Sequence, residues 1–513
     1  MEGASATRPR LVELVAALSL AADLGLGQEM EHGLRACLIA IRLAERIELH
    51  PATRDDVYWL SLLAMAGCTA DSFEMRQVWG DDLALRAGMF DAGPSELAMA
   101  RYFLSRAGSD GGPIHRTNAS ARLLASRMRA VVESMTTHCQ VTGGLAEELR
   151  FGPGVVDPLQ HTFARWDGKG VPRGVSGEAI AIAARVFAVA NYVEVEHRRA
   201  GIEPALELAR RFAGSILDPD LVEVLARDAP KIFGALEHPS WEAVLEAEPG
   251  ARARLVGDQF DVVLSALGDF ADLKSPWFSG HSGRVAQLAA SAAGLLALPQ
   301  DDLVRLRRAA LVHSVGRAGV PNTIWDKTGR LTIAERERMQ LYAYYTDRIL
   351  RHGSLTDLAD LASASHERID GSGYPRGLDG SRLEPAARVL AAADVYDALT
   401  SPRPHRAARP PDAAADELAR EARDGRLDSE AVEAVRKAIG QGRSPRPTAP
   451  AGLTPREVEV LRLIAIGHTT AQVAQVLTIS PKTADHHIQH IYAKIGAFNR
   501  SAATMFAMRH GLV

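Results

Sequence analysis

The segment "IDGSGYPRGLDGSRLEPAARVLAAADVYDA", residues 369–398, has an altered copy elsewhere in the same chain. The copy, "WDGKGVPRGVSGEAIAIAARVFAVANYVEV", spans residues 166–195 and lies 203 positions earlier. Each consists of a glycine-rich loop with a proline, followed by a long run rich in alanine and valine. A match of this kind between distant segments indicates a duplicated domain. The sequence therefore predicts two related domains in tandem.

Both copies have the periodicity of helices. Apolar residues recur three and four positions apart, as at Leu288, Ala292 and Leu295, and alternating runs of β-branched residues are scarce. We therefore expect an all-α fold, with two helical domains in tandem and a four-helix domain at the C-terminus. The expected segments are a first domain at 1–228 with an insertion at about 90–140, a connecting helical segment at 229–257, a second domain at 258–440, a flexible linker at 441–452 and a final domain at 453–513.

The composition excludes several classes of protein. Of the 513 residues 47% are hydrophobic and 24% charged, as in packed globular domains, and the net charge of -4 indicates no particular partner. Three cysteines without a CxxC spacing exclude a disulfide framework and a thiolate metal site. The most apolar windows, such as 285–298, are too short or too interrupted to span a bilayer. We expect a cytoplasmic protein without a membrane partner.

The segment 453–513 contains signals for the starts of helices. Thr454 and Glu457 match a capping box, with Pro455 at the first helical position. Thr470 is expected to cap a second helix, and Ser480 a third. The spacing of these signals predicts a compact bundle of short helices.

The third of these helices has an apolar face and a polar face. Its apolar positions at i, i+4, i+7 and i+11 define one buried stripe of Ala484, Ile488, Ile491 and Ile495. Lys482, His486 and Gln489 then face outward. A row of hydrogen-bonding and basic groups beside a short scaffold helix suits insertion into the major groove of DNA. Six basic against three acidic side chains in 453–513 give only a modest attraction to phosphate, so we expect a dimer.

This segment resembles the C-terminal DNA-binding domain of the LuxR and NarL/FixJ families, from "LTPRE" through "SPKT" to "RHGLV". The resemblance implies double-stranded DNA as a partner, an inverted-repeat operator, and a homodimer held by the last helix, from about Asn499 to Arg509. It also implies which side chains of the third helix contact DNA. These are Lys482, Thr483, Asp485, His486, Gln489, His490 and Lys494.

The second copy resembles the HD-GYP subgroup of HD phosphohydrolases, which hydrolyse cyclic di-GMP. The resemblance rests on "GHSGRVA" from 280, "HSVGRAGVP" from 313, "HERIDGSGYPRGLDG" from 366 and "ARVLAAADVYDALTSPRPHR" from 387. In that family two or three metal ions, held by imidazoles and carboxylates, activate a bridging water. The resemblance places retained metal ligands at His281, His313, His366 and Asp394.

Three other ligand positions are altered. Ser314 replaces the aspartate of the His-Asp pair, Tyr342 replaces a histidine, and Ser365 replaces the first histidine of a His-His pair. A neutral hydroxyl cannot supply the charge with which a carboxylate bridges two cations. We therefore expect no catalytic residue and no cofactor, with a single divalent metal on the retained ligands as the alternative. Arg317 stands at a phosphate-contacting position, so Arg317 and Tyr342 are candidates for a ligand pocket.

The first copy has lost more of the pattern. Ala64, Met65, Phe163 and Asn191 stand at ligand positions, and only His32 matches the family. A cavity at the lost metal site, lined by Ala64, Met65 and Phe163, would be apolar and would suit a hydrophobic small-molecule effector. The other interpretation is that these side chains fill the space as core.

These features lead to one main hypothesis and two alternatives. The main hypothesis is a ligand-responsive transcription regulator whose HD-type domains are a catalytically inactive module for sensing and dimerisation. The first alternative is a metal-dependent cyclic di-GMP phosphodiesterase coupled to DNA binding. The second is a scaffold that docks other signalling proteins through the loop Gly373–Pro375.

Overall fold

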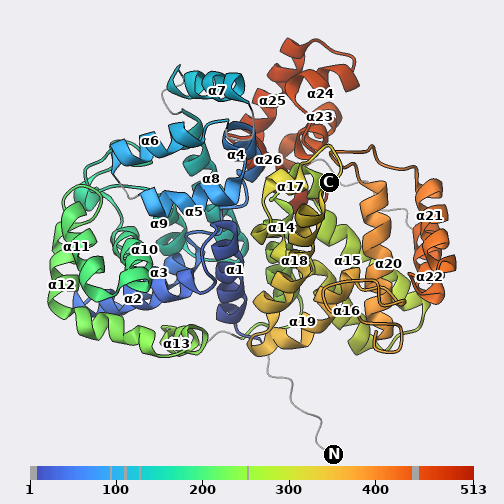
Figure 1. Ribbon diagram of the computed structural model, residues 1–513, viewed down its shortest axis with the longest axis horizontal. Coiled ribbons are helices and arrows are strands. Elements are labelled where there is room, and N and C mark those ends of the chain that lie inside the picture. The colour runs from blue at the N-terminus through green and yellow to red at the C-terminus, as the bar shows by residue number, and fades with distance from the viewer. Residues whose placement is uncertain (1–8, 93–94, 109–111, 126–128, 251–253, 442–449) are drawn as a thin grey trace, which may run out of the picture. The chain divides into compact units, whose positions relative to one another are not determined.

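The structure is a computed structural model that describes residues 9–92, 95–108, 112–125, 129–250, 254–441 and 450–513. These residues form helices joined by loops, without a β-strand among them, which confirms the expected all-α class (Figure 1). They group into two compact units. The first ends at Val263 and includes His352–Ser354, and the second comprises Leu264–Arg351 and Leu355–Val513. Every helix within the described ranges is too short or too polar to cross a bilayer.

The helices of the first unit are α1 (Leu11–Gly25), α2 (His32–Arg46), α3 (Pro51–Leu63), α4 (Ser72–Trp79), α5 (Asp82–Ala92), α6 (Glu96–Arg106), α7 (Pro113–Ala125), α8 (Arg129–Glu148), α9 (Pro153–Leu159), α10 (Ile182–Ala200), α11 (Ile202–Phe212), α12 (Pro219–Phe233) and α13 (Ser240–Ala247). Its core is formed by α2, α3 and α10, which pack against one another. α2 buries Leu34, Leu38 and Ile41 because their spacing of four and three places them on one face.

The expected insertion and the expected connecting segment both contain helices in this unit. The expected insertion at about 90–140 forms α6, α7 and the first part of α8. The expected connecting segment, 229–257, contains α13, which buries Trp241 and Val244 and packs against α1 and α2. The compact unit therefore continues beyond residue 228, because the apolar face of α13 completes its core.

The HD-type helices of the second unit are α14 (Asp258–Asp272), α15 (His281–Leu295), α16 (Gln300–Val312), α17 (Asn322–Trp325), α18 (Ile333–Leu350), α19 (Thr356–Ser363), α20 (Pro385–Thr400), α21 (Pro411–Arg423) and α22 (Ser429–Gln441). α15 packs against α16, α20 and α22. A short 3-10 turn at Val315–Gly319 closes onto α18. Gly316 permits this contact, since a Cβ added there would lie 2.1 Å from the carbonyl oxygen of Tyr342.

The C-terminal helices are α23 (Pro455–Ala465), α24 (Thr470–Val476), α25 (Pro481–Ile495) and α26 (Arg500–Arg509), as the expected four-helix domain requires. The expected apolar stripe of α25 lies in their shared core, with Ala484, Ile488 and Ile491 buried and Ile495 packed against them. Residues 442–449, most of the expected linker at 441–452, lie outside the described residues.

Two of the three expected helix caps are confirmed. Thr454 caps α23 in a capping box, and Ser480 caps α25. The expected cap at Thr470 is wrong by one residue, because Thr469 caps α24. The Thr469 hydroxyl accepts a hydrogen bond from the Gln472 N–H, and the Gln472 side chain accepts one from the Thr469 N–H.

Candidate functional site

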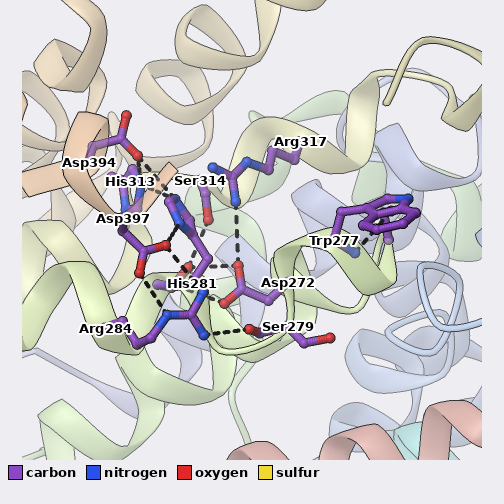
Figure 2. Close-up of polar contacts among 12 residues, drawn as sticks. Asp272, Trp277, Ser279, His281, Arg284, His313, Ser314, Arg317, Asp394 and Asp397 are labelled. Carbon is purple, nitrogen blue, oxygen red and sulfur yellow. Dashed lines mark hydrogen bonds and ion pairs between the residues drawn. The ribbon is translucent and has the colours of Figure 1, made fainter. Parts of the chain in front are cut away.

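Three metal-ligating side chains of the second unit converge from three helices (Figure 2). His281 is the first residue of α15, His313 follows the last residue of α16, and Asp394 lies within α20. Because α15 packs against both α16 and α20, the three side chains meet in the interior. His281 Nε2 lies 3.2 Å from His313 Nε2 and 3.1 Å from Asp394 Oδ1. His313 Nε2 lies 3.4 Å from the same oxygen.

Hydrogen bonds on the far side of both rings determine where their protons lie. His313 Nδ1 is 2.7 Å from the carbonyl oxygen of Ala310, which only accepts, so this nitrogen carries the proton. His281 Nδ1 is 2.6 Å from Asp397 Oδ2 and donates to that carboxylate. With a single proton on each ring, at Nδ1, both Nε2 atoms would present lone pairs toward the Asp394 carboxylate, as binding of a metal requires. Three electron-rich atoms that face one another in this way fit a bound divalent cation.

The carboxylates at this site are ionised. Burial raises the pKa of Asp397, but the charge of Arg284 and the hydrogen bond from His281 lower it more, to well below its usual range. Arg284 Nε lies 2.7 Å from Asp397 Oδ1. At Asp394 burial also raises the pKa, and the surrounding histidines lower it well below the usual value. The sequence analysis missed Asp397, although the repeat carries an acid at the matching position, Glu194.

His366 approaches the second oxygen of the same carboxylate. Its Nε2 lies 3.3 Å from Asp394 Oδ2, and its ring stacks on Tyr374 with 4.8 Å between centroids. Burial lowers the pKa of His366 to about 3, so the ring is neutral and its nitrogen is available to a metal. The structure thus brings together all four predicted ligand positions, with His366 outside the tight group formed by His281, His313 and Asp394.

The three altered ligand positions contribute hydroxyl groups to this region. Ser314 Oγ lies 2.8 Å from Ser282 Oγ. The hydroxyls of Tyr342 and Ser365 are buried and lack a hydrogen-bond partner among the described residues. Burial raises the pKa of Tyr342, so its phenol keeps the proton. In the part of the chain that the structure describes, one cluster therefore has metal-ligand geometry, and no carboxylate joins it to a second.

Two guanidinium groups, the buried Arg317 and the half-buried Arg403, lie against the ring of Phe278. The Cζ atom of Arg317 lies 4.3 Å, and that of Arg403 5.1 Å, from the ring centroid. Arg317 also lies over the ring of Tyr342, which contacts His366 in turn. Burial and the charge of Arg317 lower the pKa of Arg403 to about 10, so Arg403 remains cationic at neutral pH. The expected ligand candidates Arg317 and Tyr342 thus lie together, and Arg317 Nη1 also lies 3.5 Å from Asp272 Oδ1 (Figure 2).

The corresponding histidine of the first unit is fully hydrogen-bonded. His32, the first residue of α2, has its Nε2 3.0 Å from Asn191 Oδ1, and its Nδ1 contacts Glu194. Burial lowers the pKa of His32, but the hydrogen bond and charge of Glu194 raise it more, which favours the protonated ring. A protonated ring donates through both nitrogens and has no lone pair for a metal. His32 is therefore a structural histidine.

We expect Glu194→Gln to destabilise the protein by about 3–5 kcal/mol, since it leaves the buried charge of His32 without its partner. Urea unfolding of the full chain measures this loss. Glu45→Gln is the matched control, because it removes only a partly exposed pair with Arg42 and should cost less than about 1 kcal/mol. Equal costs for the two variants would contradict the assigned pair.

The same pair predicts a pH dependence. Because folding raises the pKa of His32, its contribution to stability is complete below the unfolded pKa of about 6.5. It declines as the pH rises through the folded value. Urea unfolding across this pH range should show the decline in the natural protein and a smaller one in Glu194→Gln.

A cavity of about 600 Å³ lies in the first unit. Met65 and Phe163 line it, as the sequence predicted, and so does Asn191. Ala64 is buried behind the lining, where its carbonyl oxygen lies 2.6 Å from His138 Nε2. His138 lies on α8 within the expected insertion, and the sequence analysis missed it because the second copy has no counterpart. The space is therefore not filled by core side chains alone.

The polar face of α25 carries the predicted DNA-contacting side chains. All of them are exposed, namely Lys482, Thr483, Asp485, His486, Gln489, His490 and Lys494. α24 packs against the start of this helix, as a scaffold helix does beside a recognition helix. The predicted dimerisation helix, α26, buries Met505 and Met508 within the second unit. These two side chains therefore do not face a partner in this arrangement.

Lys494 also has a partner within its own domain. Its Nζ lies 2.7 Å from Glu457 Oε2, which accepts a hydrogen bond from the Thr454 N–H at 2.7 Å. The hydrogen bond from Lys494 lowers the pKa of Glu457 to about 2. The ion pair therefore ties the end of α25 to the start of α23.

We expect Thr454→Ala to weaken α23 by about 1 kcal/mol, because it removes the side-chain oxygen of the helix cap. Amide hydrogen exchange of residues 455–465 in the full chain measures the effect. Thr332→Ala, which removes the matching cap of α18, is the control and should leave exchange in α23 unchanged. Unchanged exchange in α23 for Thr454→Ala would show that the cap contributes nothing.

Two family models match the chain. Residues 265–431 match an HD domain, and residues 451–507 match the luxR family of bacterial regulatory proteins. The first match contains the converging histidines and Asp394. The second contains the exposed face of α25.

Several characterised proteins are similar to this chain. A 3'3'-cGAMP-specific phosphodiesterase 3 of Vibrio cholerae is 33% identical over 84% of this chain and 94% of its own length. A cyclic di-GMP phosphodiesterase of Thermotoga maritima is 34% identical over 34% of this chain and 47% of its own. A solved structure of a cyclic GMP-AMP-specific phosphodiesterase from V. cholerae matches 85% of this chain and 99% of its own, at 28% identity and a TM-score of 0.59.

Proposed function

Because the chain belongs to the HD-domain phosphodiesterase family and also carries a LuxR-family DNA-binding domain, we propose that it is a transcription regulator whose HD domains bind signals without hydrolysing them. The second HD domain is the receptor for a phosphodiester of the cyclic dinucleotide class on which the relatives are named to act. The C-terminal domain binds the operator.

The observation that carries this proposal is the hydroxyl of Ser314 at the centre of the site. Ser314 lies next to His313, where the family resemblance places a bridging aspartate, and its Oγ pairs with Ser282. A two-metal mechanism needs anionic ligands that hold two cations side by side. Ser314, Tyr342 and Ser365 supply none, so a nucleophilic water has no two-metal clamp to activate it.

The residues that remain suit binding. A metal held by His281, His313 and Asp394, with His366 in reach, supplies a Lewis acid when it is bound. Arg317 Nη1 lies 3.5 Å from Asp272 Oδ1, and Arg317 Nε, which has no hydrogen-bond partner among the described residues, is free to donate to a phosphate. The buried hydroxyls of Tyr342 and Ser365 supply further donors. Binding without turnover follows from this combination of charges and donors.

DNA binding gives the regulator its output. The exposed face of α25 enters the major groove, with Gln489 and His486 directed to bases and Lys482 to phosphate. A homodimer doubles these contacts and predicts two half-sites about one helical turn apart in an inverted repeat. A ligand changes this output only if it binds the DNA-competent and incompetent arrangements unequally.

A working phosphodiesterase is the second candidate, and the similarity over 94% of a phosphodiesterase favours it. The two candidates are separated by restoring the lost ligands. The triple variant Ser314→Asp, Tyr342→His and Ser365→His should gain hydrolysis of 3'3'-cGAMP or cyclic di-GMP in the presence of Mn²⁺ or Fe²⁺. A natural protein that already matches the triple variant in rate would overturn the proposal.

A further inference from the structure

The cavity of the first unit is bounded by two sets of residues. Met65, Phe163 and Asn191 stand at positions that the family resemblance assigns to metal ligands. The insertion supplies a further wall through Met99 of α6 and Met135 of α8. Segments that have no counterpart in the second copy thus contribute part of the lining of this cavity.

The interior of the cavity is apolar and adaptable. Methionines come from α4, α5, α6 and α8, and aromatic rings such as Phe90 and Phe103 lie among them. Unbranched thioether side chains adjust to the shape of a flexible apolar chain. A volume of about 600 Å³ lies within the range of sites that hold small molecules.

The charged groups within the wall are paired with one another, two carboxylates to one guanidinium. Arg86 pairs with Asp71 and lies 3.2 Å from Asp82. Ser134 donates to the same Asp71 carboxylate. Because these groups are already paired, the part of a ligand that enters the interior needs no charged group.

The opening of the cavity has the opposite character. Arg165, Lys169 and Arg173 line the cavity from one loop, and Lys169 and Arg173 are exposed, which places them at its edge. Arg165 pairs with Asp167 at 2.7 Å, Lys169 Nζ lies 3.9 Å from the same carboxylate, and Glu196 is a half-buried acid of the lining. The cations at the opening outnumber the acids, so an anionic end group is favoured there.

We propose that this cavity binds a small amphipathic carboxylic acid, with an unbranched apolar chain among the methionines and the carboxylate between Lys169 and Arg173. The site is distinct from the phosphodiester site of the second unit. Binding of the acid in this cavity does not depend on the proposed function. A role of the acid as an effector of DNA binding does rest on that function.

Titration calorimetry of the full chain with sodium decanoate, and with decan-1-ol as the neutral analogue, tests the site. Decanoate should bind at one molecule per chain. Met99→Trp should weaken binding at least tenfold by filling the cavity. Leu97→Trp on the same helix is the matched control, because Leu97 is 72% exposed, and it should leave binding unchanged. Should Met99→Trp fail to fold, Ala188→Phe fills the space from α10.

The double variant Lys169→Glu and Arg173→Glu tests the end group. It should weaken decanoate binding at least tenfold and leave decan-1-ol binding unchanged. No binding of decanoate, or equal binding to Met99→Trp and Leu97→Trp, would overturn the site. Unchanged decanoate binding to the double variant would overturn its assignment to an acid.

Operator affinity, measured separately with and without decanoate, distinguishes failure of this inference from failure of the proposed function. Decanoate binding without a change in operator affinity removes the role of the acid as effector. If the chain binds no operator, the proposed regulator is contradicted. The calorimetric titrations then still decide whether the cavity binds decanoate.

Discussion

Asp394→Asn should abolish metal binding by the second HD domain. The substitution removes the one anionic oxygen that faces the Nε2 atoms of both His281 and His313. The loss should exceed the roughly 10- to 100-fold that follows removal of a supporting group such as Asp397. The first unit carries this substitution naturally at Asn191, where the matching histidine bonds to the amide oxygen. Elemental analysis and calorimetric titration with Mn²⁺ measure the effect.

The matched control is Asp416→Asn, which changes an exposed aspartate of α21. It should bind Mn²⁺ as the natural protein does. Asp397→Asn should fall between the two, because it leaves the ligands in place but replaces the carboxylate that orients His281 with a weaker, neutral acceptor. Equal metal content in Asp394→Asn and Asp416→Asn would show that the cluster does not hold the ion.

Gln489→Ala should reduce operator affinity by about 1–3 kcal/mol and relax the preference for one base pair, as loss of a bidentate base contact does. Lys482→Ala should weaken binding to all sequences alike and lower the salt dependence by about one ion. Fluorescence anisotropy with operator and scrambled duplexes, at several salt concentrations, separates these two patterns.

Gln287→Ala is the control for Gln489→Ala, since Gln287 is an exposed glutamine of α15 in the HD domain. It should leave affinity and specificity unchanged. If Gln489→Ala weakened the operator and scrambled duplexes equally, Gln489 would be a phosphate contact and not a base contact.

The sequence predicted the fold well because its signals are local. The spacing of Ala484, Ile488 and Ile491 requires one buried face, and the structure buries all three. The cap of α24 was predicted at Thr470, although the sequence contains a signal that identifies Thr469. Thr469 is followed three residues later by Gln472, so the capping-box pattern selects Thr469 over its neighbour.

The candidate sites were harder to predict because they depend on contacts between distant segments. The family pattern identified His281, His313 and Asp394, but it gave no sign that Asp397 orients one of the rings. It also gave no sign of His138, whose bond to the Ala64 carbonyl depends on how the insertion folds back. The volume of a cavity depends on how side chains from distant segments pack, and the spacing of residues in the sequence does not predict this packing.

The two copies of the repeated segment depart to different extents from the ligand pattern that the resemblance implies. In the second, the histidine lone pairs and a carboxylate still converge, and three hydroxyls stand where other ligands belong. In the first, a protonated His32 has taken hydrogen bonds in place of a metal. Each departure replaces cation-binding groups with hydrogen-bonding or apolar ones, which suits receptors better than hydrolases.

Turnover by the natural protein tests the central claim most directly. The full chain, loaded with Mn²⁺ or Fe²⁺ and assayed for metal content in the same preparation, is incubated with 3'3'-cGAMP and with cyclic di-GMP. We predict at most one metal per chain and no linear dinucleotide or mononucleotide product. Two metals per chain with steady product formation would contradict the account, and the DNA-binding domain would then belong to a working phosphodiesterase.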